Sequence, residues 1–445
     1  MEPQAQSIVN GDDSGGFLAS CRLRLCSAAD GLRRSVDVGF AAKLGKIARD
    51  DPRRVAHALK VGLALTLVSV VYYVTPLFNG FGDSTLWAVL TVVLVMEFTV
   101  GGTLSKGLNR VFATLIAGFL AVGAHLVANL CGEKGEPILL GLFVFVVASA
   151  ATFSRFIPEI KARYDYGVLI FIMTFSMVAV SSYRVEELIQ YAHQRASTVA
   201  VGVATCLFTS IFIFPIWAGE DVHKLASVNL DKLAEFLEGM ESECFGENTA
   251  SENLESKPFL QVYKSVLNSK AREDSLCTFA RWEPIHGRFR FRHPWSQYQK
   301  LGALCRQCAC SMEALASYVV ILRNSHCPEV NPERCLKIRT SCHEMCSHSA
   351  RVLRELAKAV RTMTVPTPTN NDMSAAIEAA NCFTSDLSGD ATLLQVMHVA
   401  VIASLLSDLV MRIKAITESV DNLAQLARFR KAQKTRNDVV INIDC

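Results

Sequence analysis

Apolar residues are concentrated between Ala58 and Trp217, and the remainder of the chain has the composition of an ordinary polar, helical protein. Six apolar segments stand out in that range, each about as long as the ~20 residues that cross a bilayer core. They cover residues 57–75, 84–101, 111–130, 138–154, 165–182 and 198–217. The pattern predicts an all-α membrane protein with six transmembrane helices followed by a helical domain.

The charges in the connecting segments predict the orientation. Arg22–Arg54 contains nine Lys or Arg residues, whereas the first predicted loop, Thr75–Ser84, contains none. Later loops alternate in the same way, and the last one, with Arg184 and Arg195, also carries acidic residues. Because cytosolic loops are enriched in Lys and Arg, both termini are expected in the cytosol.

Three regions follow from this topology. Residues 1–55 are a basic cytosolic segment, residues 56–218 the six-span domain, and residues 219–445 a cytosolic helical domain. Helices are expected near 297–323 and 332–362, and the last helix carries an a/d seam from Ile402 to Leu423. Such a seam suits a dimer contact or a helix buried in its own bundle, and the sequence leaves both open.

Composition supports a membrane protein and excludes several classes of function. The 445 residues are 51% hydrophobic, which is high for a soluble protein, and the net charge of +3 gives no nucleic-acid footprint. Walker motifs, Gly-rich nucleotide loops and nucleophile elbows are absent, so neither an enzyme, an ATP-driven pump nor a cofactor is expected.

The 15 cysteines are expected to be reduced, since nearly all lie on the predicted cytosolic side. Two groups resemble metal-ligand spacing. They comprise Cys305, Cys308 and Cys310, and Cys342, His343, Cys346 and His348. Both fall in helical patterns on which four ligands would not converge, so no metal site is predicted.

Glu97 is the most unusual charge, because it lies three residues from the end of the apolar stretch Thr85–Val100. Intramembrane carboxylates often mark ion or substrate pathways, although an interfacial glutamate that contacts headgroups would look the same. Lys60 lies inside the first apolar run at a comparable predicted depth and is the candidate partner of Glu97.

Further cations lie at the predicted cytosolic helix ends. They are Arg110, Arg155, Lys161 and Arg163, with Asp165 expected to offset part of the charge of Arg163. Rings of Lys or Arg are typical of anion pores. The positive-inside rule alone would produce the same distribution, so a pore and a purely topological role remain open.

The soluble stretch Arg281–Tyr298, RWEPIHGRFRFRHPWSQY, cannot be a regular helix. It is expected to be an ordered loop in which Trp282 and Trp295 fill a core. His286 and His293 have either a packing or a regulatory role. In the third span, His125 is expected to be a hydrogen-bonded packing residue, and Trp87 an anchor at the outer interface.

Several motifs together resemble the plant aluminium-activated malate transporters, which are anion channels. They are WAVLTVVLVMEFTVGGTLSKGLNR at Trp87–Arg110, FIPEIKARYDYG at Phe156–Gly167, FPIWAGED at Phe214–Asp221, and WEPIHGRF with HPWSQYQKLG at Trp282–Gly302. The resemblance runs from about Asp51 to Ala316 and is loose beyond.

The resemblance implies a homodimer that conducts malate, chloride, nitrate and sulfate passively and in a voltage-dependent manner. It implies roles in permeation for Lys60 and Glu97, and pore-lining roles for Lys161 and Arg163, with Arg155 and Arg110 behind them. It links the WEP region to cytosolic-domain integrity and gating. That region comprises Trp282, Glu283, Pro284, His286, Gly287, His293 and Trp295.

Some family members are opened by external aluminium, for which Glu159, Asp83, Glu186 and Glu187 are candidates here, although the predicted orientation places Glu159 inside. The plasma membrane is the preferred location, and the vacuolar membrane the other one. Besides the channel, two hypotheses stay open. One is a proton-coupled exporter of organic acids that uses His125 and Glu97, and the other is a membrane-anchored scaffold that dimerises through the 402–423 seam.

Overall fold

The computed structural model describes residues 38–73, 85–132, 134–181, 185–245, 257–287, 289, 293–324, 332–366, 370–387 and 393–430. All regular structure within these ranges is helical, and the only β-type pairings there are two isolated bridges. Residues 247–256, a polar stretch whose sequence is typical of a loop, lie outside these ranges, as does Asp83.

The chain divides into two compact units, of which the first ends at Leu63. Its helices are α2 (Val38–Asp50) and the first half of α3 (Pro52–Tyr73). Asp51 separates the two helices and begins the second one, since its carboxylate accepts a hydrogen bond from the Arg53 backbone N–H over 3.2 Å. Pro52 follows at the first helical position, where it needs no hydrogen-bond donor.

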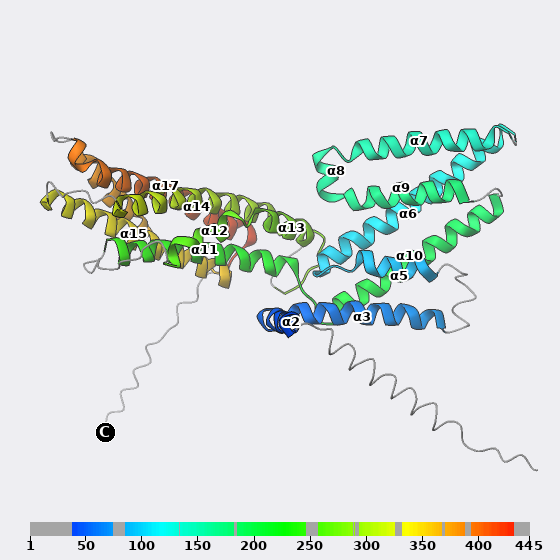
Figure 1. Ribbon diagram of the computed structural model, residues 1–445, viewed down its shortest axis with the longest axis horizontal. Coiled ribbons are helices and arrows are strands. Elements are labelled where there is room, and N and C mark those ends of the chain that lie inside the picture. Colours follow the sequence, from blue (N-terminus) through cyan, green and yellow to red (C-terminus); the bar gives the residue numbers. More distant parts are fainter. Residues whose placement is uncertain are drawn as a thin grey trace, which may run out of the picture. The chain divides into compact units, whose positions relative to one another are not determined.

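The second unit contains the remaining apolar helices (Figure 1). They are α5 (Thr85–Val95), α6 (Val100–Asn129), α7 (Glu136–Ser154), the short α8 (Pro158–Arg163), α9 (Asp165–Ser181) and α10 (Val185–Phe212). Three stretches are long and apolar enough to cross a membrane, namely residues 100–129, 136–154 and 192–212. Shorter apolar helices cover 86–95 and 165–180.

Small and large side chains divide α6 into two faces. Ala117, Ala121 and Ala124 are buried and pack against Phe175 and Val178 of α9. Large residues on the other side, such as Phe119, are exposed, and no residue of α7 is buried. Apolar surfaces of this kind are expected where a helix faces hydrocarbon.

Two predicted helix boundaries are wrong. The second apolar segment does not stay helical to residue 101, because α5 ends at Val95 and Thr99 begins a new helix by accepting a hydrogen bond from Gly102 N–H over 3.2 Å. The predicted loop before the third span is therefore the first part of α6. Likewise Arg195, expected in a loop, lies in α10 and is buried.

The remaining helices of the second unit form a bundle with one large apolar core (Figure 1). Its helices are α11 (Ala218–Cys244), α12 (Phe259–Leu267), α13 (Lys270–Ala280), α14 (Trp295–Asn324), α15 (Pro332–Thr362), α16 (Asn370–Leu387) and α17 (Leu393–Ala427). The helices predicted near 297–323 and 332–362 are confirmed as α14 and α15.

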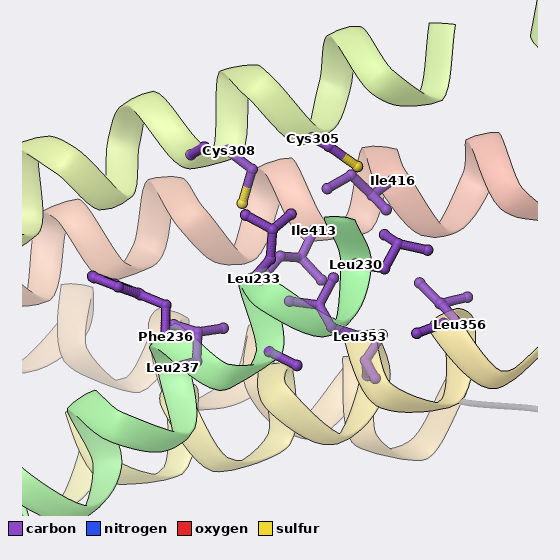
Figure 2. Packing of buried hydrophobic residues seen from close by; sticks show 14 of the residues in the cluster. Leu230, Leu233, Phe236, Leu237, Cys305, Cys308, Leu353, Leu356, Ile413 and Ile416 are labelled. Carbon is purple, nitrogen blue, oxygen red and sulfur yellow. The ribbon is translucent and has the colours of Figure 1, made fainter. Parts of the chain in front are cut away.

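The a/d seam of α17 is buried within its own bundle. Ile413, Ile416 and Val420 are fully buried, and Figure 2 shows the first two beside Leu233 of α11 and Leu353 of α15. The seam therefore packs inside the chain that carries it and is not available as a dimer contact.

Four of the cysteines with metal-like spacing lie in the same apolar core, namely Cys305, Cys308, Cys342 and Cys346, whereas Cys310 is exposed. Cys305 and Cys308 point between Leu233 and the isoleucines of α17 in Figure 2, and burial raises the pKa of the Cys308 thiol to about 12. A thiol in such surroundings stays protonated, which disfavours metal binding. The structure brings no group of three or more potential metal ligands together among the residues it describes.

Candidate functional site

Glu97 lies in the break between α5 and α6 rather than inside a helix. Its backbone N–H donates to the Thr103 hydroxyl over 3.0 Å, and its carboxylate forms an ion pair with Lys106 of α6. Both side chains are about 30% exposed. Glu97 is therefore a partly exposed, paired carboxylate at the start of α6, and Lys106 was not identified as its partner from the sequence.

Lys106 and Arg110 occupy one face of α6, one turn apart, and Tyr166 of α9 contacts both. The Lys106 ammonium lies 5.6 Å from the centre of the Tyr166 ring, and Arg110 donates a hydrogen bond to the Tyr166 hydroxyl over 3.1 Å. Arg110 is 1% exposed, and its Nε has no hydrogen-bond partner. A buried guanidinium is thus held by a neutral hydroxyl.

The corner formed by α7, α8 and α9 carries the other predicted cations. Arg155 forms a bidentate ion pair with Asp165, at 2.7 Å and 3.2 Å. Asp165 was expected to offset Arg163 but pairs with Arg155 instead, because the turn of α8 brings these two side chains together. Lys161 and Arg163 are exposed in the last turn of α8.

The two groups of cations are joined through Asn109. Its side-chain amide donates to the Arg163 carbonyl over 3.1 Å, which fixes the corner against α6. Gly167 of α9 packs against Asn109 at the same place. Arg110, Arg155, Lys161 and Arg163 therefore belong to one region. Lys60 lies in the first half of α3, in the other compact unit.

Glu283 of the WEP motif is almost completely buried and binds the N-termini of two helices. Its carboxylate accepts hydrogen bonds from Ala218 N–H at 2.6 Å, Gly219 N–H at 2.9 Å and, less closely, Gly101 N–H at 3.3 Å. Gly101 opens α6, and the other two open α11. A helix N-terminus favours a carboxylate, so Glu283 stabilises both.

Close packing around this carboxylate requires glycine at two positions. A Cβ at Gly101 would lie 2.3 Å from the Phe279 carbonyl oxygen, and one at Gly219 would lie 2.6 Å from the Trp295 ring. Burial raises the pKa of Glu283, while the N–H groups of Gly219 and Ala218 and the nearby His286 oppose that rise. The WEP motif thus links an apolar helix to the helical bundle.

The two histidines of the loop are packing residues. The His286 ring stacks on Trp217 at 3.9 Å, and its Nδ1 donates to the carbonyl of Pro284. Gly287 follows with a φ of +52°, which glycine adopts readily. His293 is buried, and burial lowers its pKa to about 4, with smaller contributions from His223 and His286.

The two tryptophans of this loop have different surroundings. Trp295 is 6% exposed and belongs to the bundle core, as predicted. Trp282 does not fill that core. It is half-buried and lines a cavity beside α6, α7 and α9, because the turn that ends α13 points it toward the apolar helices. Pro284 is exposed in the same turn.

Comparison with known sequences identifies the family of this chain. The family model described as aluminium activated malate transporter matches residues 45–394, which include every candidate residue above. The chain belongs to this family. The match extends well past Ala316, where the resemblance was expected to become loose.

Three relatives illustrate the similarity. The chain is 66% identical to aluminum-activated malate transporter 1 of Triticum aestivum, over 96% of this chain and 94% of the relative. It is 45% identical to aluminum-activated malate transporter 2 of Arabidopsis thaliana, over 87% of this chain and 78% of the relative. It is 42% identical to aluminum-activated malate transporter 7 of Arabidopsis thaliana, over 86% of this chain and 82% of the relative. The family is one of transporters, not of enzymes.

Two features of this family member lie toward the other end of the apolar helices. His125 of α6 is buried, with Nε2 at 3.1 Å from the Ala179 carbonyl oxygen, which confirms it as a hydrogen-bonded packing residue. Its Nδ1 lies 3.7 Å from the carboxylate of Glu136. Trp87 of α5 is covered by the guanidinium of Arg195, 3.9 Å from the ring centre.

Arg195 is the residue that sequence reasoning missed most clearly. It also donates to the Thr174 hydroxyl over 3.3 Å, so it connects α5, α9 and α10. Its place among acidic neighbours in an apparent loop concealed it. Arginine commonly stacks on tryptophan, but Trp87 and Arg195 lie far apart in the chain and only the fold brings them together.

Proposed function

We propose that this chain is an anion channel that passes malate and inorganic anions across a plant membrane in a voltage-dependent manner. The observation that carries the proposal is Arg110, a guanidinium buried among apolar helices whose hydrogen-bond partner is the neutral Tyr166 hydroxyl. No carboxylate pairs with it within the part of the chain that the structure describes. Such a charge is costly unless an anion approaches it.

Neighbouring cations extend this positive region. Lys106 lies one turn away on α6, and Lys161 and Arg163 lie at the α8 corner that Asn109 joins to α6. Cations lining a pathway raise the local concentration of anions and lower their barrier to entry. A dianion such as malate gains more from this field than chloride does. Names of the relatives support malate as a transported substrate.

The six-span topology, with both termini in the cytosol, and the homodimer are part of the proposal. The topology is supported by the overlap of α3, α5, α6, α7, α9 and α10 with the six predicted spans, of which three contain a stretch long and apolar enough to cross a membrane. Because the α17 seam is buried, we place the dimer contact on the apolar helices. Chemical cross-linking of the protein in its membrane, compared with light scattering in detergent, tests the dimer.

Gating with help from the bundle is supported by Glu283, which binds backbone groups of both α6 and α11. A movement of the bundle is therefore transmitted to the helix that carries Lys106 and Arg110. Neutralising this carboxylate should shift the voltage at which the channel opens.

Voltage clamp of cells that express the chain tests the channel, with malate on one side and chloride on the other. The reversal potential should follow the anion gradients and ignore a pH gradient. Arg110→Gln should reduce malate current severalfold at unchanged surface protein, whereas Tyr166→Phe, the matched control that keeps the charge, should retain most of it. Equal currents in wild type and Arg110→Gln would contradict the pathway.

The alternative is an exporter coupled to protons, and the His125–Glu136 pair is the observation in its favour. Glu97 and His125 lie near opposite ends of α6, roughly 40 Å apart at 1.5 Å per residue. Between Arg110 and His125 the buried residues of α6 are alanines apart from Thr114, which disfavours a continuous proton relay along this helix. A flux that follows the pH gradient would favour the exporter.

Location and activation are tested in the same cells. A fluorescent fusion imaged with plasma-membrane and vacuolar markers tests the plasma membrane as the proposed site. External aluminium added during recording tests activation, with Glu186→Gln as the first variant, since the proposed topology places Glu186 on the outer side, whereas Glu159→Gln, on the cytosolic side, is the control.

A further inference from the structure

A cavity of about 590 Å³ lies between α6, α7 and α9, at the end of these helices that adjoins α8. Its walls are mainly apolar and come from all three helices. They include Phe112 and Ile116 of α6, Ala151 of α7, and Val168 and Phe171 of α9. This volume is in the usual range for sites that bind small molecules.

Few residues of the wall are polar. Asn109 donates an amide hydrogen to the Arg163 carbonyl, and the Ser154 hydroxyl donates to the Ala151 carbonyl over 2.7 Å, so the other side-chain donors are the Tyr164 hydroxyl and the Trp282 indole N–H. A small polar anion such as malate would therefore lose most of its hydration with few hydrogen bonds to replace it. The part of a ligand that enters this cavity has to be apolar.

Positive charge lies directly beside the cavity. Tyr164 lines it, and the preceding residue, Arg163, is exposed and has no ion pair with any residue that the structure describes. Arg155, in contrast, is neutralised by Asp165. An apolar cavity next to an unpaired arginine, at the end of two apolar helices, matches an amphipathic anion with a long hydrocarbon chain.

We propose that the cavity binds one acyl chain of an anionic phospholipid, whose phosphate is held by Arg163. The proposal does not depend on which ion is conducted, but a bound phosphate would cancel the charge that Arg163 contributes to the proposed anion pathway. Trp282 closes one side of the cavity, and the next residue, Glu283, binds the N-termini of α6 and α11. An occupied cavity therefore fixes the position of the WEP segment, and the bundle becomes sensitive to the lipid composition of the membrane.

Quenching of tryptophan fluorescence by lipids with brominated acyl chains measures this binding. The full chain is reconstituted in phosphatidylcholine vesicles that contain brominated phosphatidylserine or, separately, brominated phosphatidylcholine. Subtracting the signal of Trp282→Phe isolates Trp282 from the other three tryptophans. In wild type, brominated phosphatidylserine should quench Trp282 more strongly than brominated phosphatidylcholine does.

Two neighbouring alanines of α7 provide a matched pair of variants. Ala151 lines the cavity, whereas Ala150 is exposed on the helix surface. Ala151→Phe should fill the cavity and abolish the quenching of Trp282, while Ala150→Phe should leave it unchanged. Arg163→Gln should keep the quenching but reduce the preference for phosphatidylserine about fivefold, the effect of one basic residue near an anionic lipid.

Three results would overturn the proposal. Equal quenching by both lipids would mean that no headgroup is selected. Quenching that survives in Ala151→Phe would mean that Trp282 contacts bulk lipid from outside the cavity. Absence of Trp282 quenching would mean that no acyl chain enters and that another occupant, such as a second copy of the chain, covers the opening.

Discussion

The Glu283 carboxylate accepts a hydrogen bond from the backbone N–H of Ala218 over 2.6 Å, across 65 positions of the chain. The same carboxylate accepts a hydrogen bond from the first turn of α6. The first residues of the helical bundle, at the start of α11, and the first residues of a candidate membrane-crossing helix, α6, are therefore bound by one side chain. This geometry gives the WEP motif a physical role in connecting the apolar helices to the helical bundle.

Glu283→Gln should weaken this connection. The amide keeps the size of the side chain but loses the negative charge and presents a donor to backbone N–H groups. Charge-assisted hydrogen bonds contribute about 1.5–3 kcal/mol each, so we expect roughly 2 kcal/mol less stability. The melting temperature of purified protein measures it. The control is Glu235→Gln, on the exposed side of α11, which should leave the melting temperature unchanged.

The ion pair between Glu97 and Lys106 gives a prediction that separates permeation from structure. Glu97→Gln releases the positive charge of Lys106 and should increase anion current, whereas Lys106→Gln should decrease it. Both side chains are about 30% exposed, so the pair contributes only about 0.5–1 kcal/mol to stability. Current per channel at the cell surface is the measurement. Loss of surface protein in both variants, with no further loss in the double variant, would show a structural pair instead.

Protonation of His293 predicts a dependence of stability on pH. Burial lowers its pKa from the usual 6.5 to about 4, so the native state holds the neutral ring. The resulting stability is present above pH 6.5 and is lost as the pH falls toward 4, up to about 3 kcal/mol. The groups around His293 are His223, His286 and the Tyr298 hydroxyl, which lies within 3.3 Å of it.

Melting temperatures at pH 7 and pH 5 test this dependence. His293→Phe retains an aromatic ring in an aromatic cluster and should lose part of the acid sensitivity of wild type. His343→Gln, whose ring is about half exposed on α15, serves as the control and should behave like wild type. An identical fall in melting temperature for all three proteins would assign the sensitivity to other groups.

Much of the helical architecture follows from apolar periodicity. The six apolar helices and the long helices of the bundle were predicted because hydrophobic patterns over 15 or more residues dominate weak local preferences. The break at Met96–Thr99 was missed because apolar residues continue on both sides of it, and only the capping by Thr99 marks the start of a new helix. A hydropathy profile does not show where a single side chain caps the start of a helix.

The candidate site was predicted in its residue types but not in its pairings. Lys106 with Glu97, Asp165 with Arg155, and Arg195 with Trp87 each join residues from different helices or across a turn. A sequence without tertiary contacts gives no information on which partner is near. The three backbone N–H groups around Glu283 are invisible in sequence for the same reason, since they belong to helix ends that only the fold brings together.

The two cations at either end of α8 should contribute unequally to permeation. Arg155 is paired with Asp165 through two hydrogen bonds, so its charge is largely cancelled, whereas Lys161 is exposed and lacks an ion pair in the described part of the chain. Lys161→Gln should therefore reduce anion current more than Arg155→Gln does, at equal surface protein. Raising the ionic strength with an impermeant salt should shrink this difference, because exposed charges are screened beyond ~8–10 Å. If Arg155→Gln reduces the current more than Lys161→Gln does, the Arg155–Asp165 ion pair affects permeation by holding the structure around α8. The electrostatic field of the exposed cations would then be the smaller effect. If neither variant changes the current, these cations serve only to orient the chain in the membrane.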